Sequence, residues 1–265
     1  MEIEVNIIDA FTNNNFGGNP AAVVITDSWL SEELMQNIAS ENNLSETAFL
    51  IKVGENEYAI RWFSPLTEIA FCGHATLASA FVLFGQLNSV TSIKFSAKAI
   101  GELLIEQASS GKIQMDFPAT KPKVTDEIPC ELIEGLSIEP IEVYQNSQAY
   151  FAIYNSEEDV LNIKRDNELL KTLKPLDVVA TAISNSEEYD FVSRYFWPAN
   201  GGDEDPVTGS IHTGLAPFWS ERLGKTDLIA YQASARGGIL ECRLNGDRVL
   251  VSGNAVQYMR GTITV

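Results

Sequence analysis

The sequence is short of cysteine, histidine and basic residues. Its 265 residues include three cysteines (Cys72, Cys130 and Cys242), two histidines, and 18 Lys and Arg against 36 Asp and Glu. Three cysteines without a metal-ligand spacing indicate reduced thiols, as in cytoplasmic proteins, rather than a disulfide framework. The net charge of −18 repels phosphate backbones and anionic membrane surfaces. We therefore expect no nucleic acid partner, and a small anionic ligand would need a local positive site.

Long apolar runs and common cofactor motifs are also missing. No apolar stretch reaches the roughly 18 residues that a membrane-spanning helix needs, and the first residues do not have the pattern of a signal peptide. The sequence contains no GxxxxGK[ST], no GxGxxG after a strand, no HExxH and no GxSxG. We therefore expect no bound nucleotide, no metal, no other cofactor and no association with a membrane.

What the sequence does contain predicts an α+β fold. Short runs rich in strand-forming residues follow one another without a helix between each pair, which favours antiparallel or mixed sheets. One amphipathic helix is expected at 31–43, with Ser31 as its N-cap. Two further helices, near 74–84 and 210–219, are apolar on nearly every side, so each should be buried inside a sheet that wraps around it. Gly85 and Gly224 are the expected C-caps of these two helices.

The two apolar helices belong to a duplicated unit. Arg61, Phe63 and Pro65 recur as Arg194, Phe196 and Pro198, a constant offset of about half the chain. The same offset places Cys72 on Asp205. We expect two pseudo-symmetric lobes with a cleft between them. The first lobe should comprise residues 1–118 with about 254–265 and the second residues 130–253, joined by a proline-rich linker at 119–129.

Each copy of the unit places reactive side chains at the start of its apolar helix. Cys72, Gly73 and His74 precede the first helix, and the second follows EDPVTGS, which contains Asp205, Thr208, Gly209 and Ser210. The free N–H groups of a helix N-terminus bind carboxylates, and a thiol or imidazole there can transfer protons. A purely structural role, as helix caps or buried side chains, is the alternative for both segments.

Two further positions are candidates for the same site. Glu46 stands just before an apolar strand; it is a solvated edge residue or, if it faces a dry cleft, a general acid and base. Asn19, in a polar turn before another strand, is either structural or part of the rim of that cleft.

Five segments in series identify the chain as similar to a known family. DAFTNNNFGGNPAAVV, LSETAFL, RWFSPLTEIAFCGHATLASA, GGDEDPVTGS and the late RGG turn resemble the PhzF-like phenazine-biosynthesis isomerases, from about residue 7 to the C-terminus. That family has the diaminopimelate epimerase-like fold. The resemblance implies two lobes that each wrap a sheet around a helix, a homodimer, and proton transfer next to a carboxylate on a small organic acid, without a cofactor.

The resemblance also implies roles for the candidate residues. Glu46 matches the catalytic proton shuttle, and Asp205 matches a second acidic residue of the site. Gly73, His74, Gly209 and Ser210, with Thr208 beside them, match the cradle of the substrate carboxylate, and Asn19 matches a segment near the site.

Three functions remain open on the sequence. The first is a one-base isomerase that uses Glu46. The second is a two-base racemase or epimerase of amino or hydroxy acids that uses Cys72 and Asp205, because related epimerases place two cysteines at such positions. The third is a protein without catalytic activity that binds a small carboxylate or a protein partner.

Overall fold

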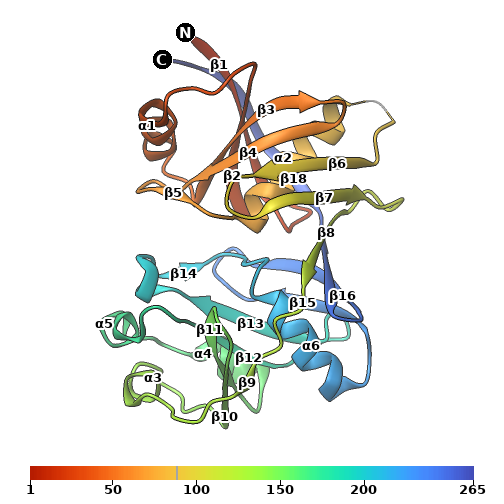
Figure 1. The fold of residues 1–265 in the computed structure, drawn as a ribbon. Coiled ribbons are helices and arrows are strands. Elements are labelled where there is room, and N and C mark those ends of the chain that lie inside the picture. The colour runs from red at the N-terminus through yellow and green to blue at the C-terminus, as the bar shows by residue number, and fades with distance from the viewer. Residues whose placement is uncertain (88) are drawn as a thin grey trace. The chain divides into compact units, whose positions relative to one another are not determined.

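The computed structural model describes residues 1–87 and 89–265. Contacts divide the chain into two units, each built from a sheet and a long central helix (Figure 1). The first unit comprises Met1–Asp116 and Ser252–Val265, and the second comprises Phe117–Val251. Residues 119–129 lie within the second unit, where the short strand β9 (Lys123–Val124) pairs with β10 (Glu142–Gln145).

The sheet of the first unit combines antiparallel and parallel pairs, as the short successive strands predict. Its strands, in spatial order, are β18 (Ala255–Thr264), β1 (Glu2–Ala10), β2 (Asn19–Thr26), β3 (Glu46–Gly54), β4 (Glu57–Phe63), β6 (Ser92–Ala97), β7 (Gly101–Gln107) and β8 (Ile113–Pro118). The pairs β2–β3 and β4–β6 are parallel and the others are antiparallel.

Two helices pack on this sheet. The amphipathic helix α1 (Glu32–Asn42) is confirmed: the Ser31 hydroxyl caps it by accepting from the Leu34 N–H, and Met35 is among the residues it buries against the sheet. Helix α2 (Gly73–Gln86) is buried along most of its length, as its apolar sequence predicts. Its C-cap is Leu87 rather than Gly85, which lies inside the last helical turn, so that predicted cap is wrong.

The second unit repeats the same strand order. After β10 come β11 (Ala149–Ile153), β12 (Asp177–Ile183), β13 (Phe191–Phe196), β15 (Asp227–Gln232) and β16 (Gly238–Asn245), and β17 (Arg248–Gly253) leads the chain back to the first unit. The successive pairs from β10 to β16 are antiparallel, parallel, antiparallel, parallel and antiparallel. The pairs from β1 through β4 and β6 to β7 follow the same series. The internal duplication predicted from the sequence is therefore confirmed.

Short helices and a second long helix complete this unit. The short ones are α3 (Cys130–Glu134), α4 (Glu157–Asn162), α5 (Asn167–Leu170) and the 3₁₀ turns η1 (Lys171–Leu173) and η2 (Pro198–Asn200). Leu132, Val160 and Leu170, from α3, α4 and α5, pack in one core cluster with strand residues of β12 and β13. The long helix α6 (His212–Leu223) ends at Gly224, whose left-handed φ of 66° confirms the predicted C-cap.

A bidentate arginine–glutamate pair occupies the same place in both copies, partly exposed in the first and largely buried in the second. Arg61 forms two hydrogen bonds with Glu68, of 2.7 and 2.6 Å, and Arg194 forms two with Glu204, both of 2.8 Å. Glu68 and Glu204 belong to the two-residue strands β5 (Glu68–Ile69) and β14 (Glu204–Asp205). In each copy the guanidinium lies over the phenylalanine two residues further on, at 5.2 and 5.0 Å from the ring centroid. The repeated Arg-x-Phe motif thus has a structural role.

The register of these short strands changes the expected match between Cys72 and Asp205. Asp205 pairs with Tyr195 as Ile69 pairs with Trp62, so the structural counterpart of Asp205 is Ile69. The second loop is longer than the first, and the constant sequence offset ends before it. Cys72 and Asp205 therefore do not occupy equivalent positions in the two copies.

Candidate active site

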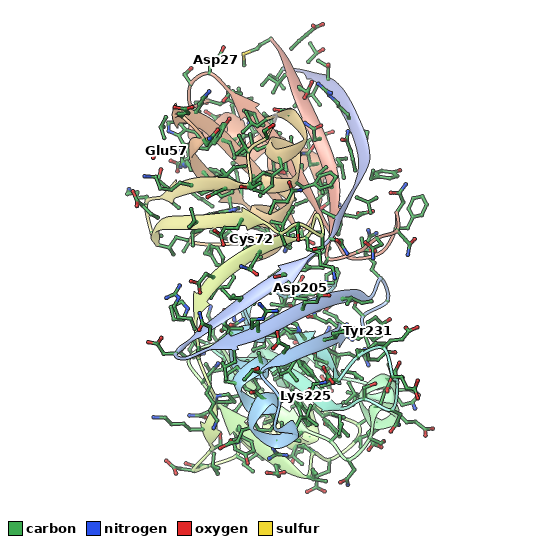
Figure 2. All side chains as sticks on the ribbon, turned by 90° about the vertical axis from the view of Figure 1, so that its right-hand side faces the viewer. Asp27, Glu57, Cys72, Asp205, Lys225 and Tyr231 are labelled. Atoms are coloured by element: carbon green, nitrogen blue, oxygen red, sulfur yellow. The ribbon has the colours of Figure 1, made fainter. Side chains whose placement is uncertain are left out.

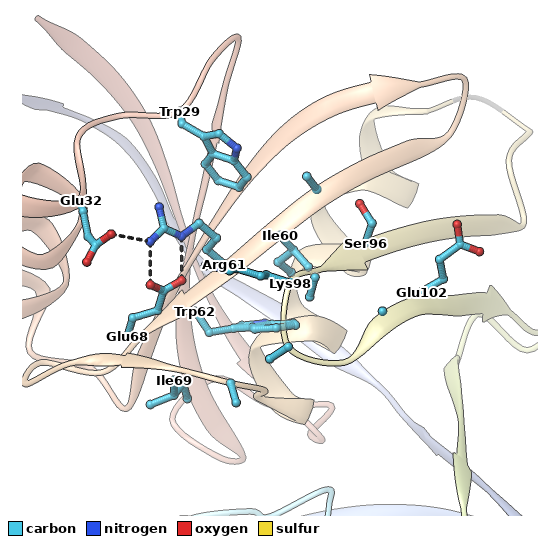
Figure 3. Close-up of a pocket in the computed structure, with 15 residues that line it drawn as sticks. Trp29, Glu32, Ile60, Arg61, Trp62, Glu68, Ile69, Ser96, Lys98 and Glu102 are labelled. Carbon is cyan, nitrogen blue, oxygen red and sulfur yellow. Dashed lines mark hydrogen bonds and ion pairs between the residues drawn. The ribbon is translucent and has the colours of Figure 1, made fainter.

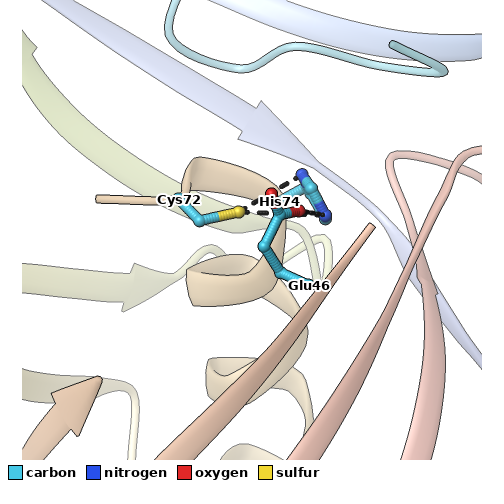
Figure 4. Close-up of side chains that lie close together, drawn as sticks. All are labelled: Glu46, Cys72 and His74. Atoms are coloured by element: carbon cyan, nitrogen blue, oxygen red, sulfur yellow. Dashed lines mark hydrogen bonds and ion pairs between the residues drawn. The ribbon is translucent and has the colours of Figure 1, made fainter. Parts of the chain in front are cut away.

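In the first unit the structure brings Glu46, His74 and Asn19 together. Glu46 begins β3, Asn19 begins β2 and His74 lies in the first turn of α2, so three adjoining elements supply one side chain each. His74 Nε2 lies 2.9 Å from Glu46 Oε2 (Figure 4). Asn19 Nδ2 lies 3.1 Å from His74 Nδ1. The His74 side chain is 6% exposed and that of Glu46 is 13% exposed, so both ends of this contact are largely shielded from water.

The contact with Asn19 favours one tautomer of His74. When the Asn19 amide donates to Nδ1, that nitrogen is the acceptor and the ring proton of the neutral imidazole sits on Nε2, facing Glu46. The buried Glu46 Oε2 atom nevertheless accepts no hydrogen bond of good geometry from the described residues. The carboxylate thus has a close proton-bearing neighbour and an oxygen that is not locked in a directed bond.

Cys72 joins this cluster as the N-cap residue of α2. Its Sγ atom lies 3.4 Å from His74 Nδ1 and 3.8 Å from Nε2 (Figure 4). The Cys72 side chain, labelled on the ribbon in Figure 2, makes no capping hydrogen bond. The first-turn N–H groups of α2, which begins at Gly73, are therefore not capped by the side chain that precedes them, as in a helix terminus that binds an anion.

The same three side chains have the donor set of a metal site. One ligand atom each of Glu46, Cys72 and His74 lies within 4.8 Å of the others. A metal at His74 Nε2 would have to displace the proton that the Asn19 hydrogen bond places there. This arrangement therefore fits proton transfer better than metal ligation.

In the second unit, Asp205 and Thr208 belong to a closed set of hydrogen bonds. The Thr208 hydroxyl donates to Asp205 Oδ2, and the Thr208 N–H donates to Gln232 Oε1 at 2.8 Å. The Gln232 amide in turn donates to the Asp205 carbonyl at 2.9 Å. The backbone N–H of Thr208, expected to bind an anion, is thus already engaged inside the protein.

Gly209 and Ser210 lie in a turn that precedes α6. The turn closes with hydrogen bonds from His212 N to Gly209 O and from Thr213 N to Ser210 O, and α6 proper begins at His212, later than the sequence suggests. His212 is fully buried, and Nδ1 lies 2.8 Å from the Thr208 carbonyl oxygen, which ties the turn to the helix. Burial lowers the pKa of His212 to about 4, because the imidazolium would lose its hydration.

The predicted site residues thus form two groups. Asn19, Glu46, Cys72, Gly73 and His74 gather in the first unit, and Asp205, Thr208, Gly209 and Ser210 gather in the second.

Three residues beside Ser210 were missed from the sequence. Gln148 Nε2 donates to Ser210 Oγ at 2.9 Å and to the Tyr195 hydroxyl at 3.1 Å, and that hydroxyl donates to Asp177 at 2.7 Å. Asp177 begins β12 as Glu46 begins β3, but this signal requires the sheet register and is not visible in the sequence spacing.

A separate groove of about 1080 Å³ lies on the first unit, away from these residues. It is lined by strands β4, β6 and β7 and by Trp29, and the paired Arg61, Glu32 and Glu68 border it (Figure 3). None of the predicted site residues lines it.

Comparison with known proteins decides the family. Residues 8–261 match the family described as phenazine biosynthesis-like protein (PhzC-PhzF). The chain belongs to the PhzF-like family. A curated relative, an uncharacterized isomerase of Pseudomonas aeruginosa, is 44% identical over 263 residues that cover 99% of each chain.

Solved structures agree with this assignment. A PhzF family protein of Enterococcus faecalis has a TM-score of 0.94 at 42% identity, with 100% of each chain covered. A structure described as an epimerase, from Pseudomonas aeruginosa, has a TM-score of 0.77 at 19% identity over 99% of each chain, a likeness of fold alone. The expected α+β, diaminopimelate epimerase-like fold is confirmed, and the protein is an isomerase of this family. Among the described residues, no helix is long and apolar enough to cross a membrane.

Proposed function

We propose that this isomerase moves a proton at a carbon next to the carboxylate of a small organic acid, with Glu46 as the acid and base and without a cofactor. The contact between Glu46 Oε2 and His74 Nε2, 2.9 Å apart, carries the proposal. A general acid and base must lie within hydrogen-bond reach of the proton that it removes and returns. Glu46 has one oxygen beside an N–H group and accepts no directed hydrogen bond on that oxygen.

The remaining residues of the proposal bind the substrate and stabilise charge. The N–H groups of Gly73 and His74 open α2, and the dipole of this helix favours negative charge at that end. In this proposal Gly209 and Ser210, in the turn before α6, are also carboxylate-binding residues. Such fixed donors stabilise the enolate-like charge that develops when the proton is removed. Asp205 assists as a second acidic residue, and its hydrogen bond from the Thr208 hydroxyl holds its orientation.

Deuterium exchange tests the role of Glu46. The protein is incubated in D₂O with L- and D-amino acids, hydroxy acids and cyclic unsaturated carboxylic acids, and deuterium entry is followed by proton NMR. Glu46→Gln should slow exchange by about 100-fold or more, since general acid–base catalysis contributes roughly 10²–10⁴. Glu57→Gln, on the neighbouring strand β4 with a side chain 43% exposed, serves as the matched control and should exchange at the wild-type rate. Undiminished exchange by Glu46→Gln would refute the role of Glu46.

A two-base racemase or epimerase is the second candidate, and the short distance from Cys72 Sγ to His74 Nδ1 favours it. That contact of 3.4 Å would allow the thiol to pass a proton to the imidazole. This candidate requires that Cys72→Ala abolish exchange, whereas the Glu46 mechanism tolerates alanine at this position. The same NMR experiment with Cys72→Ala therefore separates the two.

A further inference from the structure

The duplicated sheet gives Glu46 a structural counterpart in the second unit, Asp177. Thr47 pairs with Phe63 in the first unit, and Val178 pairs with Phe196 in the second. In both units the arginine of the Arg-x-Phe motif lies over this phenylalanine ring, which supports the comparison. The residue before Thr47 is Glu46 and the residue before Val178 is Asp177, so the two carboxyl groups stand at the same place at the start of equivalent strands.

The parallel neighbours confirm this match. Ala21 of β2 pairs with Glu46, and Ala149 of β11 pairs with Asp177. Two residues before Ala21 stands Asn19, whose amide contacts the first turn of α2. One residue before Ala149 stands Gln148, whose amide contacts the turn before α6. Each unit therefore brings an acid, an amide and the start of its long helix together.

Asp177 is a buried carboxylate that only accepts hydrogen bonds. Its Oδ2 atom accepts from the Tyr195 hydroxyl at 2.7 Å, and its Oδ1 atom accepts from Asn200 Nδ2 at 2.8 Å. Asp177 is 9% exposed and Tyr195 is 4% exposed. Burial raises the pKa of Asp177, and the two hydrogen bonds act in the opposite direction because they favour the ionised form.

Because the Asp177 carboxylate can only accept, it sets the direction of the hydrogen bonds from Tyr195 through Gln148 to Ser210. Because the Tyr195 hydroxyl gives its proton to Asp177, its oxygen must accept from Gln148, which fixes the NH₂ end of the Gln148 amide toward it. The same NH₂ group donates to Ser210 Oγ. Ser210 is an acceptor in this bond, so its own hydroxyl proton is available to point at a ligand.

We propose that Asp177, Tyr195 and Gln148 are positioning residues that keep the Ser210 hydroxyl as a hydrogen-bond donor to a carboxylate ligand. This inference rests on the proposed function, in which Ser210 belongs to the carboxylate cradle. Without the Tyr195 hydroxyl, the Gln148 amide is free to turn over and present its carbonyl oxygen to Ser210. The Ser210 hydroxyl would then donate its proton to the Gln148 carbonyl oxygen, and the ligand would lose this hydrogen-bond donor.

A binding titration on the full chain tests the relay. Sodium acetate and sodium benzoate are titrated into ¹⁵N-labelled protein, with sodium chloride as the ionic-strength control, and the backbone amide signals of Gly209 and Ser210 are followed. Ser210→Ala should raise Kd about tenfold, the value of one hydrogen bond to a charged group. Tyr195→Phe should raise Kd at least threefold. Tyr154→Phe is the matched control, because this equally buried hydroxyl donates to the Ile138 carbonyl instead, and it should bind as the wild type does.

The double variant distinguishes a relay from general damage to the fold. If Tyr195 acts through Ser210, Tyr195→Phe combined with Ser210→Ala should bind no more weakly than Ser210→Ala alone. Additive losses would overturn the proposal. Gln148→Met, which keeps the length of a partly exposed side chain, provides the same test if Tyr195→Phe does not fold: its loss should also disappear in the Ser210→Ala background, and wild-type binding by Gln148→Met would refute the relay.

The same data separate this inference from the proposed function. If neither acid shifts the Gly209 and Ser210 signals of the wild type, these residues do not bind a carboxylate. The proposed positioning of Ser210 is then refuted as well. If Ser210→Ala weakens binding and Tyr195→Phe does not, the cradle stands and only the relay is refuted. With an acid that exchanges deuterium, the relay further requires Tyr195→Phe to raise KM while kcat changes little, as expected for a contact made equally in the ground and transition states.

Discussion

The buried histidine at the start of α6 should make the protein less stable in mildly acidic solution. His212 has a pKa of about 4 in the folded state, against about 6.5 in an unfolded chain. The folded state therefore binds its proton less readily than the unfolded state does. The contribution of neutral His212 to the free energy of unfolding is fully present above pH 6.5. It is lost as the pH falls from 6.5 toward 4.

The size of the effect follows from the linkage between protonation and folding. Each pH unit below 6.5 should cost about 1.4 kcal/mol until the folded pKa is approached. Between pH 7.5 and 5.5 we expect a loss of roughly 1.3 kcal/mol in the free energy of unfolding. This window lies above the range in which most carboxyl groups titrate, so the signal of the imidazole is separable from theirs.

Urea unfolding at pH 7.5, 6.5 and 5.5, followed by circular dichroism, measures this loss. His212→Asn can keep a donor to the Thr208 carbonyl but cannot titrate, so its stability should be nearly flat over the same range. The chain has only two histidines, and His74→Gln controls for the other. An equal pH dependence in His212→Asn and the wild type would show that His212 is not the source. An NMR titration midpoint of its ring protons near 6.5 would refute the physical account.

Two further predictions concern stability. Arg194→Met should lower the free energy of unfolding by about 1.5–3 kcal/mol, because it removes the bidentate partner of Glu204 (14% exposed), which keeps only its hydrogen bond from Arg165. Arg243→Ala, which breaks a surface pair, should change it by less than about 1 kcal/mol in the same denaturant assay; similar losses in both would contradict the assigned burial. Gly224→Ala should destabilise by about 1 kcal/mol because of its left-handed backbone, while Gly85→Ala, inside α2 with open space around it, should stabilise by roughly 0.5–1 kcal/mol. Thermal melts should show a lower melting temperature for Gly224→Ala and a higher one for Gly85→Ala. A shift in the same direction for both variants would contradict this account.

The sequence was sufficient for the fold class because its strongest signals are repeated. Two helices that are apolar on all sides have few possible surroundings other than a wrapped sheet, and the Arg-x-Phe repeat marked the duplication. Strand β12 was missed because its residues are buried on both faces, so it shows no alternation of polar and apolar positions. Helix α4 was missed although Ser156 and Asp159 form a capping box, a local signal that could have found it.

The site was predicted only in part, for a related reason. Glu46, His74 and Cys72 were found because the helix start and the strand start are visible as motifs, and the structure brings them together. Asp177, Tyr195 and Gln148 come from three separate strands or turns. Their association depends on strand register, which a single sequence does not specify when the loops of the two copies differ in length.

The placement of β18 has a consequence for how the chain matures during synthesis. β18 pairs with β1 along nearly its whole length, yet the entire second unit is translated between them. At 5–20 residues per second, about 12 to 50 seconds pass between the synthesis of β1 and that of its partner strand. The second unit is a continuous segment and can fold in that time. The first unit, although its synthesis begins first, is therefore completed last, when β18 pairs with β1. Until then the ribosome-bound chain exposes one unpaired edge of β1, the kind of strand edge that aggregates and that chaperones protect.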